Sequence, residues 1–241
     1  MHKILLLGAC LLAVAWLPAN ADECSPEGHD RASRALRDRL YPMLEAGDDP
    51  GFAAPFAALV LSEVARTDRA APWMTSGERA TMVERAASYV ESVRDYRGYV
   101  AGEGWRHGVA HGADWLMQLS LNPALDRAQL DRVLAASASQ AAPASGHAYV
   151  FGEPGRLAWP LLFIAQRQQL SLQDWQAWLA RLQADVAGTK QQDFGRWLAR
   201  RHDLVALLSV LYLRADQSGE PGMRDLKPAI EAALKAAGGP S

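Results

Sequence analysis

The sequence predicts an all-α fold, and two observations support this prediction. From Asp30 onward, apolar residues recur with the 3.6-residue period of an amphipathic helix, and alternating runs of β-branched residues are nearly absent. The connections between the predicted helices are mostly short, which favours antiparallel neighbours. We therefore expect roughly eight or nine helices packed as antiparallel helical hairpins. Their lengths favour a HEAT-like, α-solenoid-like right-handed stack, although the residues show no clear repeat period.

Turn and capping residues separate the predicted helices along the chain. The helices are expected over residues 30–46, 51–69, 76–93, 104–120, 126–140, 157–169, 171–187, 191–214 and 223–237. Gly195 and the run Arg200-Arg201-His202 could divide the longest of them in two.

Capping boxes mark three of the helix starts. In each, a Ser, Thr or Asp is followed three residues later by Glu, Gln or Asp, so that the two residues can bond each other's backbone N–H groups. Each cap contributes about 1 kcal/mol. The pairs are Thr75 with Glu78, Asp126 with Gln129, and Ser171 with Asp174.

The first 21 residues have the features of a secretory signal peptide. Lys3 gives a short positive region, residues 4–16 form an apolar run, and Ala19-Asn20-Ala21 is an A-x-A cleavage site. The apolar run is shorter than the roughly 20 residues of a membrane span. We therefore expect export to the periplasm or out of the cell, after cleavage near Ala21, with no transmembrane segment in the mature chain.

The mature chain, residues 22–241, is expected to form a single α-helical domain, because its length allows one substantial core. The whole chain has 25 Lys and Arg against 27 Asp and Glu; removing Lys3 with the leader changes the formal charge from −2 to −3. This near-neutral balance gives no electrostatic footprint for nucleic acid and no polybasic patch for anionic lipid. A protein or a small molecule is the expected kind of partner.

Cys24 is the only cysteine of the predicted mature chain, because Cys10 lies in the leader. An intramolecular disulfide and a cysteine-based zinc site are therefore excluded. Cys24 is either an incidental thiol or the site of an intermolecular disulfide. Residues 7–10 also fit a lipoprotein cleavage box, but cleavage there would leave an apolar region of only six residues.

A polar stripe is the least generic feature of the sequence. It lies on the helix predicted over residues 104–120 and consists of His107, His111, Asp114 and Gln118. At about 100° per residue, these positions lie within about 60° of one another. One face of the predicted helix therefore has two imidazoles, a carboxylate and an amide in a line.

The opposite side of this predicted helix is apolar and is expected to face the core. It includes Trp105, Val109 and Leu116. The presence of Gly108 and Gly112 in this predicted helix calls for an explanation, because a glycine inside a helix destabilises it by roughly 1 kcal/mol relative to alanine. Close approach of a neighbouring helix, or room for a ligand, would supply that explanation.

The polar stripe has three interpretations. It could be a hydrogen-bonded network between packed helices, in which Asp114 orients a histidine. It could line a groove for a small molecule or a peptide, with Arg97 and Trp105 as further ligand-binding residues. It could also hold a divalent metal ion, because His107 and His111 one helical turn apart, completed by a carboxylate, form a known ligand set. The segment lacks the glutamate of the H-E-x-x-H motif.

Other candidate features are more easily explained by structure. Asp95 and Arg97 are expected to form an ion pair that fixes the turn before the polar stripe. The segment 147–156 could cover a groove or simply connect two helices. His202 and Asp203 could contribute distant ligands, but such a pair in a charged helical stretch is expected on a solvated helix face. No G-x-S-x-G elbow, P-loop or dinucleotide-binding fingerprint occurs in the sequence.

The segment Asp95-Tyr-Arg-Gly-Tyr-Val, followed by Gly104-Trp-Arg-His-Gly-Val-Ala-His-Gly-Ala-Asp114, resembles the signature D-x-R-G-[FY]-V … G-W-x-H-x-x-A-H-x-A-D of a bacterial family, domain of unknown function 2785. The resemblance implies an all-α fold over about residues 35–215 and implies no activity. Many relatives lack an export leader, so their cellular role need not transfer. The matching positions are Asp95, Arg97, Gly98, Gly104, Trp105, His107, His111 and Asp114.

Two functions are consistent with these features. The first is a non-enzymatic binding or scaffold protein of the cell envelope, with a polar groove centred on the stripe. The second is a metal-dependent hydrolase, in which His107, His111 and Asp114 hold a divalent metal ion and a metal-bound water acts as nucleophile. The sequence leaves open whether the protein is an enzyme.

Overall fold

The computed structural model describes residues 25–48 and 50–238 of the chain. The predicted signal peptide, its cleavage site and Cys24 lie outside these residues. The all-α prediction is confirmed: the described part contains nine helices of 12 to 24 residues, the four-residue α10 and two strands of two residues each. The elements are α2 (Pro26–Glu45), α3 (Ala53–Ala70), α4 (Ser76–Ser92), β1 (Tyr99–Val100), β2 (Gly104–Trp105), α5 (Gly108–Ser120), α6 (Arg127–Ala141), α7 (Glu153–Gln166), α8 (Leu172–Ala187), α9 (Phe194–Gln217), α10 (Pro221–Arg224) and α11 (Lys227–Gly238).

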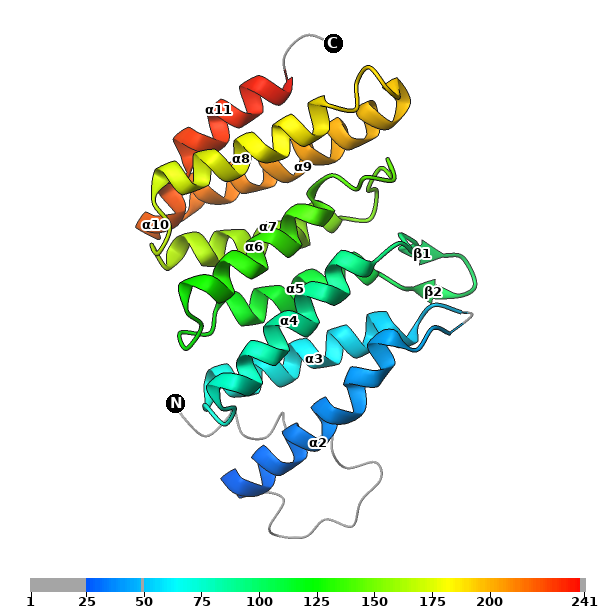
Figure 1. Cartoon of the computed structure of the whole chain (residues 1–241), viewed down its shortest axis with the longest axis vertical. Coiled ribbons are helices and arrows are strands. Elements are labelled where there is room, and N and C mark those ends of the chain that lie inside the picture. The colour runs from blue at the N-terminus through cyan, green and yellow to red at the C-terminus, as the bar shows by residue number, and fades with distance from the viewer. Residues whose placement is uncertain (1–24, 49, 239–241) are drawn as a thin grey trace.

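The helices pack in adjacent pairs and stack along the long axis of the molecule (Figure 1). Alternate helices also touch: α3 packs on α5, α5 on α7 and α7 on α9, while α4 packs on α6. The predicted hairpins are therefore present, whereas the right-handed solenoid stays a prediction. In the described part of the chain, none of the helices combines the length and apolar character needed to cross a bilayer.

All three predicted capping boxes are present at the starts of α4, α6 and α8. In the α6 box, the Asp126 carboxylate accepts the N–H of Gln129 at 2.9 Å, and the Gln129 side-chain oxygen accepts the N–H of Asp126 at 2.9 Å. These starts lie at one edge of the stack. At the other edge, α3, α5, α7 and α9 begin, and β1 and β2 lie at this same edge (Figure 1).

Several predicted helix boundaries differ from the structure by three or four residues, as at the starts of α2, α7, α9 and α11, and one wrong boundary bears on the polar stripe. Residues 104–107 are not helical; α5 begins at Gly108, and β1 pairs with β2 in a small hairpin. Gly102 and Gly104 take positive φ angles of 82° and 96°, which glycine adopts without the steric cost of a side chain. Trp105 therefore lies on the hairpin, half exposed, and not on a core-directed helix face.

Two expectations for the longest helix are also wrong. Neither Gly195 nor the Arg200-Arg201-His202 run divides it, because α9 is continuous. Asp203 is fully buried instead of solvated, and its carboxylate accepts the N–H of Tyr149 at 2.9 Å. One face of α9 is buried along the length of the helix, which favours an unbroken helix. Asp203 lies on that buried face, next to Leu204.

Candidate functional site

Five aromatic side chains meet beside the first turn of α5, and we call them the histidine–aromatic cluster. The start of α5 provides two imidazoles, and the other three rings come from α3, from β2 and from the loop before α7. The members are Phe56, Trp105, His107, His111 and Phe151.

The rings of this cluster form a connected row. Trp105 stacks on His107 with ring centroids 4.3 Å apart and planes 5° from parallel, and His107 meets His111 edge-on at 5.9 Å. His111 in turn contacts Phe56 at 5.6 Å, and Phe151 meets Trp105 nearly perpendicularly at 5.7 Å. Two members of the row are open to solvent, since Phe56 is 43% and Trp105 46% exposed.

The hairpin fixes the position of Trp105. Tyr99 and Trp105 are cross-strand partners, and their rings touch at 5.2 Å. Gly98 allows Phe151 to close over the hairpin, because a Cβ atom at position 98 would lie 2.1 Å from the Phe151 ring. The signature glycine before β1 is thus needed for packing.

His107 joins the hairpin to α5 in a left-handed conformation, with φ 54° and ψ 40°. Its N–H donates to the Arg97 carbonyl at 3.2 Å. Its buried Nδ1 has no hydrogen-bond partner among the described residues. Burial lowers the pKa of His107, and the neighbouring His111 adds to this effect against the opposing charge of Glu153. The imidazole is therefore neutral at pH 7.

A polar group borders the cluster on the side of α7. The Asp114 carboxylate accepts a hydrogen bond from Arg156 at 2.7 Å, and its second oxygen lies 3.9 Å from Nδ1 of His111. That distance is too long for a hydrogen bond. Within the described residues, Nδ1 of His111 and the side-chain oxygen of Gln118 are also buried without a partner. Asp114 therefore pairs with Arg156 and does not orient a histidine.

Four of the five predicted ligand-binding residues lie together here. His107, His111, Asp114 and Trp105 belong to one region, whereas Arg97 reaches it only through its main-chain carbonyl, which accepts the N–H of His107. The Arg97 guanidinium donates to both carboxylate oxygens of Asp95, at 2.8 and 2.9 Å, as the sequence predicts.

Arg97 instead lines a different pocket of about 290 Å³, formed mainly by the ends of α2 and α4, the start of α3 and Gly108. Asp95, Asp48 and Glu45 also line it, together with Arg94. The Asp48 carboxylate already accepts the first N–H groups of α3, and Asp95 pairs with Arg97. Glu45 pairs with Arg85, outside the pocket. These three carboxylates are therefore already engaged by the protein itself.

Sequence reasoning did not assign a role in the site to Phe56, Phe151, Glu153 or Arg156. Three of these lie in the 147–156 segment, which was expected either to cover a groove or to connect helices. Glu153 is buried and accepts the N–H of Phe151 at 3.0 Å, so it holds the loop over the cluster. No local signal could have shown that α3 and α7 flank α5.

Close helix packing explains the one interior glycine of α5. A Cβ atom at Gly112 would lie 2.6 Å from Val90 and 3.1 Å from the Tyr89 ring, both on α4. Approach of a neighbouring helix, the first of the two reasons expected from the sequence, therefore applies to Gly112. Gly108 is the first residue of α5, where a Cβ atom would make only ordinary contacts of 3.4 to 3.5 Å, and the Tyr89 hydroxyl donates to its carbonyl.

The donor set does not by itself form a metal centre. Among the described residues, no three His, Cys, Asp or Glu side chains are grouped so that they could hold a metal ion. Asp114 is engaged by Arg156, so only the two imidazoles remain available. A predicted metal ion on His107, His111 and Asp114 would have to displace that arginine.

Comparison with known proteins gives one match. A family model described as "Protein of unknown function (DUF2785)" matches residues 40–213. This range runs from the end of α2 into the last turns of α9, includes the whole histidine–aromatic cluster and agrees with the range expected from the resemblance. No curated protein and no solved structure matches the chain.

Proposed function

The chain belongs to the DUF2785 family, and we propose that it is a binding protein whose recognition site is the histidine–aromatic cluster. The ligand that fits this site best is a polypeptide segment with an apolar or aromatic side chain. The observation on which the proposal rests is the connected row of rings, of which Phe56 and Trp105 stay 43% and 46% exposed. Exposed aromatic and arginine side chains are the residues that contribute most to binding at protein interfaces.

The unpartnered imidazole nitrogens favour a ligand with polar atoms. A buried nitrogen without a hydrogen bond costs about 1–3 kcal/mol. The Nδ1 atoms of His107 and His111 are in this state with respect to the described residues. A peptide main chain offers both N–H and C=O groups beside its side chains. It can therefore satisfy imidazoles of either tautomer while its side chain packs on Trp105.

Arg156 adds a polar anchor at the rim. Its side chain is 48% exposed, and Asp114 is its one hydrogen-bond acceptor in the described part of the chain. A guanidinium has five N–H donors in a planar fork. The remaining donors can bind carbonyl oxygens of an extended peptide.

The test is to select binders from a displayed library of random short peptides on the full chain. Peptides enriched on the parent protein should bind Trp105→Ala at least about tenfold more weakly, as expected for loss of an aromatic anchor. Phe56→Ala should weaken them as well. Phe194→Ala is the matched control, because Phe194 is 53% exposed at the start of α9.

Peptide binding that is lost with Trp105 and Phe56 but kept with Phe194→Ala would support the proposal. Enrichment of no peptide, or binding indifferent to Trp105→Ala, would refute it. Circular dichroism spectra and melting curves of each variant show whether the fold is intact.

A metal-dependent hydrolase is the second candidate function, favoured by one observation. His107 and His111 are adjacent, and their Nδ1 atoms are without hydrogen-bond partners in the described region. Metal analysis of the purified chain separates the two functions. Near-stoichiometric zinc or another divalent metal, lost in both His107→Ala and His111→Ala, would favour the hydrolase and justify activity screens. No metal in the parent would favour the binding protein.

We also propose that the protein is exported through the leader formed by residues 1–21. The support is the sequence of the leader alone, with its apolar run and A-x-A site. N-terminal sequencing of the protein made with its leader in a bacterium should find Asp22 as first residue in the periplasm or medium. An intact leader on cytoplasmic protein would contradict export.

A further inference from the structure

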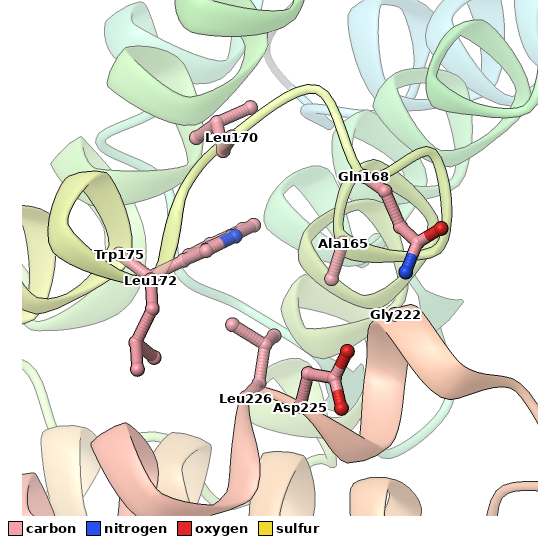
Figure 2. Close-up of a pocket in the computed structure, with 8 residues that line it drawn as sticks. All are labelled: Ala165, Gln168, Leu170, Leu172, Trp175, Gly222, Asp225 and Leu226. Carbon is pink, nitrogen blue, oxygen red and sulfur yellow. The ribbon is translucent and has the colours of Figure 1, made fainter.

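A small pocket of about 170 Å³ lies where the C-terminal end of α7, the start of α8 and α10 meet (Figure 2). It is separate from the histidine–aromatic cluster, and the inference below does not rest on the function proposed for that cluster. Its volume is smaller than the roughly 300–1,000 Å³ of pockets for drug-sized ligands. Its lining residues are Ala165, Gln168, Leu170, Leu172, Trp175, Gly222, Asp225 and Leu226.

The walls of this pocket are fixed by the main chain. Gly222 packs so closely on α7 that a Cβ atom there would lie 2.4 Å from the Ala165 carbonyl oxygen. Gln168 has a positive φ of 53°, an uncommon conformation for a residue with a side chain. The capping box of Ser171 and Asp174 holds the start of α8. The pocket is therefore a built feature and not a gap between mobile side chains.

One side of the pocket is apolar. Trp175 and Leu226 are each only 4% exposed and form its inner wall, with the half-buried Leu170 beside them. Leu172 lies at the mouth and is largely exposed. Figure 2 shows Trp175, Leu172 and Leu226 gathered on one side of the opening. This side has room for a short hydrocarbon chain.

The other side is negative. Asp225 is the one charged side chain among the eight that line the pocket, and its carboxylate makes no ion pair with any described residue. The neighbouring cations are otherwise engaged: Arg167 donates to main-chain carbonyls after α5, and Lys227 pairs with Asp216. Arg224 precedes Asp225 but does not line the pocket.

The end of α7 strengthens this negative character. Ala165 lies in the last turn of α7 and Gln168 follows its end by two residues, and both line the pocket. The C-terminal end of a helix acts as a partial negative charge and favours cations nearby. In Figure 2 the side-chain amide of Gln168 lies on the same side as the Asp225 carboxylate.

We propose that this pocket binds a short aliphatic primary amine. Its hydrocarbon chain packs between Trp175, Leu170 and Leu226, and its ammonium group donates to the Asp225 carboxylate and the Gln168 amide oxygen. The apolar wall alone would accept any short alkyl chain, whereas the carboxylate and the helix end select the cation. A carboxylate ligand of the same length would be repelled.

Three probes of matched length test the proposal: n-pentylamine, 1-pentanol and pentanoate. Each is titrated into the full chain, and binding is followed by amide shifts in two-dimensional NMR, with Gly222 and Leu226 as reporters. Because hydrogen bonds to charged groups are worth more than neutral ones, pentylamine should bind about tenfold more tightly than pentanol. Pentanoate should bind more weakly than either.

Two variants complete the test. Asp225→Asn should reduce pentylamine affinity to that of pentanol, about tenfold, and leave pentanol binding unchanged. Glu220→Gln is the matched control, because Glu220 precedes α10, is exposed and does not line the pocket. Equal binding of amine and alcohol, amine binding that survives Asp225→Asn, or shifts confined to other regions would overturn the proposal.

Discussion

His107 adopts a backbone conformation that costs energy for any residue with a Cβ atom. Its φ of 54° and ψ of 40° lie in the left-handed region, where a side chain costs roughly 1–2 kcal/mol. This geometry turns the chain from β2 into α5 and stacks the imidazole on Trp105, beside His111. Strain of this kind tends to occur at functional sites, which agrees with the role proposed for the histidine–aromatic cluster.

We expect His107→Gly to be more stable than His107→Ala by roughly 1 kcal/mol, because glycine accepts a positive φ that alanine resists. Both variants lack the imidazole, so the difference between their free energies of unfolding reports the backbone strain at position 107. Urea unfolding of the two proteins measures this difference. A glycine variant no more stable than the alanine variant would show that position 107 is not strained.

Asp203 is a second residue that departs from a simple rule. It is fully buried, one of its oxygens accepts the N–H of Tyr149, and the other has no partner among the described residues. Burial raises the pKa of this carboxyl to about 6, the N–H of Tyr149 and the charge of His202 oppose the rise, and the nearby Glu153 supports it. In the unfolded chain the pKa is about 3.9.

The folded protein therefore holds this proton over a pH range in which the unfolded chain has lost it. Stability from this group is complete below about pH 4 and declines as pH rises through the folded pKa of about 6. In Asp203→Asn this decline should be absent, because the amide does not titrate. The stability of the variant relative to the parent should rise by roughly 1–3 kcal/mol from acid to neutral pH. Urea unfolding of both proteins across that range measures it, and a constant difference would contradict the assignment.

At the scale of helices, the starts of α5 and α7 differ from those of their neighbours. The helices α4, α6 and α8 each begin with a full capping box. The carboxylates of Asp48 and Asp193 accept N–H groups at the starts of α3 and α9. The helices α5 and α7 begin with left-handed residues, His107 and Gly152, and receive no side-chain cap from the described residues. These two uncapped starts flank the proposed binding site.

We expect Asp126→Ala to destabilise the protein by about 1 kcal/mol, because it leaves N–H groups at the start of α6 without acceptors. Asp126→Asn should destabilise the protein by only about a few tenths of a kcal/mol, since an asparagine oxygen also caps. Chemical denaturation compares the two. Equal losses in both variants would mean that the charge of Asp126, and not its cap, stabilises α6.

Helix starts were predictable where the signal is local, and unpredictable where two patterns overlap. The three capping boxes depend on residues three apart, and all were found from sequence. The stretch 104–107 was assigned to a helix because His107 continues the spacing of His111 and Asp114. The closely spaced Gly102 and Gly104 were the signal for a turn. Both take positive φ, which continuous helix does not allow.

At the scale of the whole molecule, the candidate site depends on contacts that no local pattern contains. The Asp114–Arg156 pair joins residues 42 positions apart, and the His111–Phe56 contact joins α5 to α3. The sequence identified the chemistry at the start of α5 but not the helices that flank it. The hairpin layout could be predicted from helix lengths, whereas the order in which alternate helices pack could not.

The layered packing also predicts how stability is distributed. The central helix α5 lies between α3 and α7 and buries 12 of its 13 residues, whereas the end helix α2 packs chiefly on α3 and buries 4 of its 20. In stacks where each element contacts only its neighbours, terminal elements open at lower free energy than central ones.

We therefore expect hydrogen exchange, followed by mass spectrometry under native conditions, to be slowest in α5. Exchange in α2 should be faster by orders of magnitude, because each 1.4 kcal/mol of lower opening free energy speeds exchange about tenfold. Leu40→Ala, which removes a buried contact of α2, should accelerate exchange in α2 and leave α5 unchanged. If α2 and α5 exchanged at the same rate, or if Leu40→Ala accelerated both equally, the chain would unfold as one cooperative unit. The binding edge at the start of α5 would then share its stability with the whole stack instead of resting on the best-protected helix.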